Sequence, residues 1–312
     1  MNRTQYNFID LEVAQCLERL ANNDKQHLGL LSGFTQIDNV IGGFHGGDII
    51  TIAGRPGMGK TAFAMSLASN IAMNPQTPVM YFSLRLSKEI LVLRFLSSFS
   101  EIPLQYLIDC TLPLNKWEEL EKAEKNISKM SLVINETPIE DFNSIRMAAR
   151  LAARESGVRA NFIEALHYIP IKYRKNRSQN DEIAEMMYMI KALAIELDIP
   201  IFITSLLSRG ERNEWETYKQ PELHELRDSG VIEDVSDTVM FIHRPECYHV
   251  FQDEHGNDLR GLAEIHISKS PMGFDSKVNM EYKVEYAKFI PRKIPFIPYP
   301  KESLKPPFET FV

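Results

Sequence analysis

The sequence predicts an α/β fold in which a mostly parallel central sheet is flanked by helices, with extra strands at one edge. Between residues 48 and 205, short apolar runs alternate with stretches of helical periodicity, as expected for parallel strands connected through helices. After Ser236 the chain becomes rich in strand-forming residues. Its 312 residues, of which 44% are hydrophobic, are enough to form one large core.

The N-terminal segment has the pattern of a short amphipathic helix that could dock on a partner. Between residues 8 and 20 its apolar side chains recur at mixed three- and four-residue spacings, at Phe8, Leu11, Val13, Leu17 and Leu20. A polar stretch follows over residues 22–26.

Residues 48–73 predict a strand, a loop and a helix in direct succession. The run DIITIAG is typical of a buried strand, glycines interrupt it, and TAFAMSLASNIAM follows with a helical pattern. Further strands are predicted over residues 78–84, 132–135, 161–164 and 200–205, and helices over 88–99, 116–129, 144–155 and 181–197.

The C-terminal third predicts strands that extend one edge of the sheet. They are the runs at residues 237–243, 262–268 and 277–283, which polar turns separate. Six of the 17 prolines fall within residues 291–312, and this segment is therefore expected to be an extended tail without regular structure.

The strongest motif is a phosphate-binding loop that matches G-x-x-x-x-G-K-[ST] between the predicted strand and helix. Its glycines allow backbone amides to approach phosphate oxygens, and the following helix presents its positive end. Lys60 is expected to reach the β and γ phosphates, and the Thr61 hydroxyl to bind Mg²⁺. The expected ATP-binding residues in and after the loop are Gly54, Pro56, Gly57, Met58, Gly59, Lys60, Thr61 and Ala62.

Magnesium would need a carboxylate from a later strand, and Glu164 at the end of NFIE is the candidate. Its extra methylene relative to aspartate would alter the geometry at the ion. A surface carboxylate at a strand end is the alternative interpretation.

Composition and charge exclude several classes of protein. The net charge of −7 argues against a chain that coats nucleic acid through bulk charge, although a local basic groove stays possible. No apolar run is long enough for a membrane span, and the N-terminus lacks a leader pattern, so a cytoplasmic protein is expected. Three widely spaced cysteines indicate reduced thiols.

Four segments together resemble the RecA-type motor domain of the DnaB replicative DNA helicases, over about residues 30–285. They are LLSGFTQIDNVIGGFHGGDIITIAGRPGMGKTAFAMSLASNIA, PVMYFSL, HELRDSGVIEDVSDTVMFIHR and GLAEIHISK, in the family's order. The third is the most specific and argues against a KaiC- or RadA-like ATPase. The resemblance implies a RecA-like P-loop domain in a hexameric ring, with ATP at subunit interfaces and single-stranded DNA in the channel.

The resemblance also implies a domain organisation and site residues. Residues 1–27 are similar to the linker helix that packs on a neighbouring subunit, 28–290 to the motor domain, and 291–312 form the proline-rich tail; the family's N-terminal helical domain has no counterpart in this sequence. Arg94 matches an arginine that lies against the nucleotide. Arg227, Asp228 and Gly230 match the loop that holds the DNA backbone, where a cation and a glycine amide suit phosphate.

The sequence departs from the family at positions that support hydrolysis. The catalytic glutamate of FSLE is Arg85, which cannot activate water as a carboxylate would. Glu164 and His167 replace the Walker B aspartate and a following glutamine, Leu206 replaces the sensor glutamine, and the K-x-R finger reads Lys269-Ser-Pro271. An arginine finger supplies roughly 10³ to 10⁵ in rate, so ATP hydrolysis is expected to be weakened. Glu89 or Glu136 could compensate.

Two further clusters are candidates for binding. Lys172, Arg174, Lys175 and Arg177 lie where the family places a mobile channel loop, and DNA backbone binding competes there with a solvated surface. His243, Cys247, His249 and His255 fit no standard zinc spacing.

Two functions therefore remain open from the sequence. The first is a helicase motor domain that binds ATP, Mg²⁺ and single-stranded DNA as a hexameric homo-oligomer, with weakened hydrolysis. The second is a non-hydrolysing paralogue that acts as a structural or regulatory ring subunit, alone or together with an active helicase or a loader.

Overall fold

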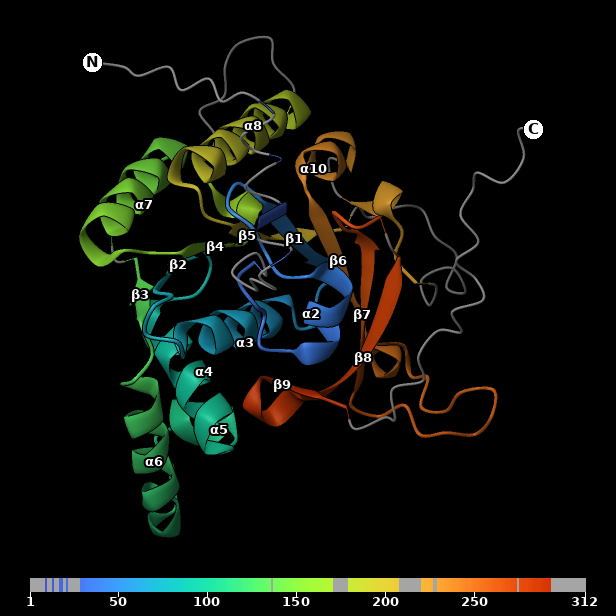
Figure 1. Cartoon of the computed structure of the whole chain (residues 1–312). Helices are drawn as coiled ribbons and strands as arrows, with labels where there is room; N and C mark the ends of the chain where they lie inside the picture. The colour runs from blue at the N-terminus through green and yellow to red at the C-terminus, as the bar shows by residue number, and fades with distance from the viewer. Residues whose placement is uncertain are drawn as a thin grey trace.

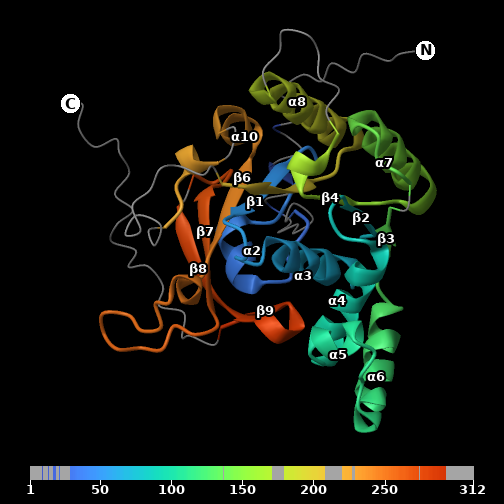
Figure 2. The ribbon, with the colours of Figure 1, turned by 180° about the vertical axis from the view of Figure 1, so that it is seen from behind.

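A computed structural model describes residues 29–135, 137–170, 179–207, 220–226, 229–273 and 275–292, with five single positions between residues 9 and 21. It confirms the predicted α/β class. One nine-stranded sheet has the order β3-β2-β4-β5-β1-β6-β7-β8-β9, and helices cover both of its faces (Figure 1 and, from behind, Figure 2). The strands are β1 (Ile49–Gly54), β2 (Val79–Ser83), β3 (Leu132–Ile134), β4 (Ala160–Glu164), β5 (Ile201–Leu206), β6 (Thr238–His243), β7 (Leu262–Lys269), β8 (Ser276–Lys283) and β9 (Lys288–Pro291).

Helices connect the parallel strands, as the alternating sequence pattern predicts. The longer ones agree with the predicted ranges to within a few residues, whereas α2, α5 and α10 were not predicted. The helices are α2 (Thr35–Ile41), α3 (Lys60–Ala72), α4 (Lys88–Ser100), α5 (Leu104–Ile108), α6 (Trp117–Ile127), α7 (Phe142–Ser156), α8 (Gln179–Leu197) and α10 (Ser229–Val235).

The first six strands in the sheet order run parallel, and the next three are antiparallel. β1 lies between β5 and β6, with Ile52 opposite Thr204 on one side and Met240 on the other. All six residues of β1 are buried, which explains its continuous apolar run. Because parallel strands end at the same edge, the segments after β1, β2, β4 and β5 meet at one edge of the sheet.

Two hydrophobic cores lie on opposite faces of the sheet. One contains α3 and part of α4, and the other contains α7 and α8, as Figure 1 shows. In the first core, the Phe162 ring of β4 stacks on Phe202 of β5 with centroids 4.2 Å apart, and on Tyr81 of β2 at 5.9 Å. Such offset aromatic pairs add about 0.5–1.5 kcal/mol each beyond the area that they bury. The strands that carry the site residues are therefore firmly held.

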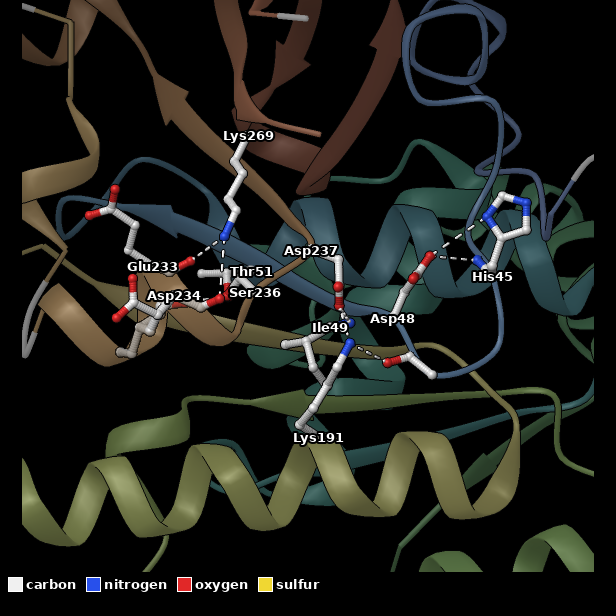
Figure 3. A network of polar contacts seen from close by, with 12 residues as sticks. His45, Asp48, Ile49, Thr51, Lys191, Glu233, Asp234, Ser236, Asp237 and Lys269 are labelled. Carbon is white, nitrogen blue, oxygen red and sulfur yellow. Dashed lines mark hydrogen bonds and ion pairs between the residues drawn. The ribbon is translucent and has the colours of Figure 1, made fainter. Parts of the chain in front are cut away.

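The start of β1 is held by a polar network (Figure 3). Lys191 reaches from α8 and donates from Nζ to the Gly47 carbonyl at 2.9 Å and to Asp237 Oδ2 at 2.7 Å. The same Asp237 oxygen accepts the backbone N–H of Ile49 at 2.7 Å. Two strands and a helix thus share one carboxylate, which fixes where β1 and β6 begin relative to each other.

The final strand, β9, was not predicted from the sequence, which placed its last residue, Pro291, in the extended tail. Its Phe289 packs edge-on against Phe63 of α3 at 5.2 Å between centroids, and its backbone N–H points to Ser66 Oγ at 3.5 Å. β9 therefore folds back over the helix that follows the phosphate loop. Most of residues 1–27 and 293–312 lie outside the described residues; of the predicted N-terminal helix, Ile9, Val13 and Leu17 are helical and exposed.

Across the part of the chain that the structure describes, no helix combines the length and the apolar character that crossing a bilayer requires.

Candidate functional site

The predicted phosphate loop connects β1 to α3 at the carboxyl edge of the sheet. Gly57 and Gly59 have φ angles of 81° and 94°, in the left-handed region that glycine adopts without strain. A Cβ on Gly59 would also lie 3.1 Å from the Phe289 ring. The glycine at position 59 is therefore required by the backbone and by the packing of β9 against the loop.

Lys60, the first residue of α3, folds back over this loop. Its Nζ donates hydrogen bonds to the carbonyl oxygens of Gly54 at 2.7 Å and Arg55 at 2.9 Å. The pKa of Lys60 is lowered to about 8, mainly by burial and also by the Arg85 guanidinium, while Glu164 opposes the shift. An incoming phosphate would exchange two neutral carbonyl partners for anionic oxygens, which favours the charged lysine.

A cavity of about 460 Å³ opens beside the loop. The phosphate loop and the first turn of α3 form one wall, and the others contain Arg85 after β2, the ends of β4 and β5, the segment after β4, and Tyr282 of β8. Arg94 of α4 also lines the cavity, and its Nε is buried without a hydrogen-bond partner among the described residues. Of the predicted ATP-binding residues, Gly54 and Met58 are not among the lining residues; those that line the cavity are Pro56, Gly57, Gly59, Lys60, Thr61, Ala62 and Arg94.

Thr61, Glu164 and Arg85 form a direct cluster in this cavity. Thr61 Oγ1 donates to Glu164 Oε1 at 2.6 Å. Arg85 Nη2 donates to the same Thr61 oxygen at 3.1 Å and lies 3.5 Å from Glu164 Oε1. The Glu164 side chain is 2% exposed and that of Arg85 is 43% exposed. The carboxylate is therefore held inside the protein while the guanidinium reaches it from the surface.

The two predicted magnesium ligands, Thr61 and Glu164, are adjacent, but a cationic side chain already contacts both. Magnesium requires a near-octahedral oxygen shell at about 2.0–2.1 Å and keeps most of its waters. A guanidinium on the same two oxygens opposes a divalent ion by charge and by the space that it takes. In the arrangement that the structure shows, the residues do not fit Mg²⁺.

Glu164 is the only carboxylate among the described residues that line the cavity. Glu89, a possible replacement base, is exposed and lines a separate cavity beside Lys88. Glu136, the other candidate, lies outside the described residues. At the end of β5, Leu206 presents an apolar side chain to the cavity where the resemblance implies a glutamine. The described cavity wall therefore contains no free carboxylate that could activate water.

The end of β4 is held in an unusual backbone conformation. Ala165 has a φ of 69°, which is uncommon for a residue with a Cβ. Its N–H donates to Thr204 Oγ1 at 2.6 Å, and His167 Nε2 lies 3.2 Å from Ser205 Oγ. Contacts with β5 thus fix the chain directly after Glu164, and such strained residues concentrate at functional sites.

Arg244, which follows β6, holds the phosphate loop from the other side. Its Nη1 donates to the Gly57 carbonyl at 2.9 Å, and its guanidinium lies over the Tyr282 ring at 4.4 Å. A close ion pair with Glu246 fixes its orientation. No role was assigned to Arg244 from the sequence, because its contact depends on β6 being the neighbour of β1.

Lys269, the predicted finger lysine, lies at the end of β7. Its Nζ donates to the carbonyl oxygens of Glu233 at 2.7 Å and Asp234 at 3.4 Å, in the last turn of α10 (Figure 3). It therefore caps that helix and is not among the residues that line the cavity of its own chain. Pro271 lies in the exposed turn after β7.

Of the predicted DNA-binding residues, only Gly230 is among the described residues. Arg227, Asp228 and the cluster Lys172, Arg174, Lys175 and Arg177 lie outside the described residues. Gly230 is exposed in the first turn of α10. Within the described ranges, no three His, Cys, Asp or Glu side chains gather as a metal-binding group.

Comparison with known proteins gives a consistent set of relatives. Residues 29–291 match the family model described as the DnaB-like helicase C terminal domain. Over 274 residues the chain is 33% identical to the replicative DNA helicase DnaB of Geobacillus stearothermophilus and 32% identical to the replicative DNA helicase DnaC of Bacillus subtilis. Each match covers 88% of this chain and 59% of the relative. This chain thus spans less than two thirds of these relatives.

Two solved structures share the fold. One is described as the structure of a DnaB-like replicative helicase and its interactions with primase. It has a TM-score of 0.79 and 26% sequence identity, and the match covers 93% of this chain and 68% of that one. The other is described as an ATPase domain, with a TM-score of 0.81 and 26% identity over 93% of this chain and 100% of that one. The similarity therefore extends over nearly the whole described chain.

Proposed function

This chain belongs to the family of DnaB-like helicase C-terminal domains, and from this premise we propose that it is a nucleotide-binding motor domain. In this proposal it binds ATP and contacts single-stranded DNA. It hydrolyses ATP far more slowly than a family member with the full set of catalytic residues. One observation carries the proposal. The phosphate loop faces a cavity in which Arg85 contacts the sole carboxylate among the described lining residues.

The loop supports binding of the triphosphate. Its glycines adopt the conformations that turn backbone amides toward an anion, and α3 begins directly behind it. Lys60 is held within the loop by carbonyl oxygens that a phosphate can replace. Arg94 adds another cation at the cavity wall, beside Lys60 and Arg85. These groups stabilise bound phosphates in the ground state and do not depend on the residues that hydrolysis requires.

The same cavity supports weak turnover. Activating water needs a carboxylate or an equivalent base within hydrogen-bond reach, and general bases supply about 10²–10⁴ in rate. Glu164 is contacted by both Thr61 and Arg85, and the Leu206 side chain has no hydrogen-bonding group. Magnesium, when bound beside the phosphates, would supply charge neutralisation; for that, Thr61 and Glu164 would have to exchange Arg85 for the ion.

We also propose that the chain assembles with other copies of itself and contacts DNA. The relatives are named replicative DNA helicases, and one related structure is described with primase. We propose a ring of several copies, six by resemblance to the family, in which Lys269 and the chain around α10 lie near a neighbouring subunit and the DNA strand. Lys269 would then have to leave the α10 carbonyls to approach a neighbour's nucleotide.

A second function is a non-hydrolysing paralogue that acts as a structural or regulatory subunit in a ring, alone or together with an active helicase or a loader. Two features favour this second function. Arg85 contacts Glu164, the carboxylate that would support hydrolysis, and Leu206 lacks the polar group that would act at its position during hydrolysis. The two functions share nucleotide binding and differ in turnover.

The experiment is a nucleotide-binding titration followed by steady-state ATP hydrolysis, with and without single-stranded DNA, on the wild-type chain and on Lys60→Ala. We expect binding that Lys60→Ala weakens at least tenfold, together with slow turnover. DNA-stimulated turnover at a rate typical of motor ATPases would contradict weakened hydrolysis. A wild-type chain that does not bind ATP would overturn both functions.

A further inference from the structure

We propose that Arg85 takes the place of the magnesium ion in this site, so that the chain binds free ATP without a divalent cation. The inference rests on the proposed nucleotide binding and goes beyond it by naming the ionic form of the ligand. Its starting point is the position of the Arg85 guanidinium on the two oxygen atoms, Thr61 Oγ1 and Glu164 Oε1, expected to serve the ion.

Arg85 contacts the two oxygen atoms in the way expected of a cation bound at this site. The Thr61 hydroxyl donates a hydrogen bond to Glu164 Oε1 at 2.6 Å, and the lone pairs of the same oxygen accept a hydrogen bond from Arg85 Nη2 at 3.1 Å. Both contacts of Arg85 with this pair use Nη2. A guanidinium has five N–H donors in a planar fork that matches phosphate oxygens, so donors remain for a ligand.

The charges of the cavity lead to the same conclusion. Among the described lining residues, Lys60, Arg85 and Arg94 are formal cations and Glu164 is the formal anion, which leaves a net charge of about +2. A glutamate at position 85, as in the family pattern FSLE, would leave about zero, and Mg²⁺ would restore two positive charges. The change from acid to arginine therefore supplies the same charge that the ion would bring.

A divalent ion at this site would lie beside the Arg85 guanidinium, which already contacts the two oxygen atoms that would bind the ion. Coulomb repulsion between the two at such short range is only partly screened in a cavity, and the buried Glu164 carboxylate alone cannot neutralise three positive charges. Magnesium could enter if Arg85 moved away from Thr61, which its partial exposure permits. Glu164 Oε2, buried and without a hydrogen-bond partner among the described residues, would then be available to the ion's water ligands.

The first test is a titration of the full chain with a fluorescent ATP analogue, once in excess Mg²⁺ and once in EDTA. We expect tighter binding in EDTA, because excess Mg²⁺ converts nearly all of the nucleotide into its magnesium complex and leaves little of the free form. A wild-type chain that binds equally well or more tightly in Mg²⁺ would overturn the inference while nucleotide binding stands. No binding in either buffer would instead mean that the proposed function fails.

The second test assigns the effect to Arg85. Arg85→Glu should restore dependence on the ion, with binding at least tenfold weaker in EDTA than in Mg²⁺. Lys88→Glu makes the same change of charge three positions along the chain, at the start of α4 and outside the cavity lining, and should bind more tightly in EDTA, as the wild-type chain does. Equal binding by Arg85→Glu in the two buffers would show that another group replaces the ion and would overturn the assignment.

The ion itself provides a readout that does not depend on the affinity. Mn²⁺ is paramagnetic, so its binding with ATP can be followed by water-proton relaxation on the same proteins. We expect no protein-bound Mn²⁺ in the wild-type complex with ATP and about one ion per chain in Arg85→Glu. Bound Mn²⁺ in the wild-type complex would contradict the proposal even if Arg85→Glu failed to fold.

Discussion

Arg244 donates a hydrogen bond from Nη1 to the carbonyl oxygen of Gly57 at 2.9 Å and thereby connects the chain after β6 to the phosphate loop after β1. The arginine side chain is only 7% exposed, and Glu246 and the Tyr282 ring hold it on either side. The conformation of the phosphate loop therefore depends on a side chain from a distant part of the sequence, which binds the backbone of the loop.

Replacing Arg244 by alanine should weaken both the fold and nucleotide binding. The change leaves the partly buried Glu246 carboxylate and the Gly57 carbonyl without a cationic donor, and we expect a loss of about 1–3 kcal/mol in the free energy of unfolding. Affinity for ATP should fall roughly tenfold as the loop loses its support. Denaturant unfolding and a nucleotide titration measure the two effects.

Arg260→Ala is the matched control, because that arginine is 70% exposed and its ion pair with Asp258 is on the surface. It should change stability by less than about 0.5 kcal/mol. Equal effects of the two substitutions would contradict a specific role for Arg244.

Replacing Arg85 by glutamate should raise steady-state ATP hydrolysis in the presence of Mg²⁺. The change removes the cation from Glu164 and provides a carboxylate at the family's catalytic position. The gain should be smaller than the roughly 10²–10⁴-fold that a well-placed base supplies, because Leu206 and Pro271 still lack their polar functions. Arg85→Gln, which removes the charge without providing a base, should stay near the wild-type rate. If the glutamate and glutamine variants turn over equally, the missing base does not limit the reaction.

Stability should fall as the pH is lowered from about 6.5 to about 4, because His243 is buried in its neutral form. Burial lowers its pKa to about 4; Glu264 opposes the shift, while His266, Arg55 and Lys277 contribute to it. In this range the unfolded chain binds a proton that the folded chain excludes, so the free energy of unfolding decreases toward acid. The full effect is about 3 kcal/mol at most.

The measurement is denaturant unfolding between pH 4 and 7, with His243→Phe as the comparison. Phenylalanine preserves a ring against Tyr248, whose centroid lies 5.6 Å from that of His243. The variant should show a smaller dependence on pH in this range. If the pH dependence of stability is unchanged in His243→Phe, another titrating group is responsible for it.

Replacing Lys269 by alanine should loosen the C-terminal turn of α10. The ammonium group donates to two of its carbonyl oxygens and also favours the negative end of the helix, together worth about 0.5–1.5 kcal/mol. Hydrogen exchange of the α10 amides should become faster. Lys283→Ala, which removes a surface lysine paired with Glu281, should leave α10 unchanged.

The features that could be predicted from the sequence are those that local chemistry determines. The phosphate loop is one, since its glycines must adopt positive φ between a buried strand and a helix. The longer helices and the parallel strands are others, because each has enough residues to show its period. The family assignment is confirmed by the match over residues 29–291.

The features that escaped prediction depend on contacts between distant segments. The short α2 and β9 are too brief to show a period and are stabilised by packing, as Phe289 is against Phe63. The loss of a base at Arg85 could be predicted, but its contact with Thr61 and Glu164 could not, because a long side chain can point in many directions. Arg244 escaped for the same reason.

The return of β9 across α3 has a consequence for how the protein is made. Tyr282 and Phe289 form the wall against Gly59, so the phosphate loop is completed by residues that lie far beyond it in the sequence. Contacts between such distant segments form late and close long loops. In a growing chain, the backbone of the phosphate loop is therefore made well before the aromatic wall that packs against it.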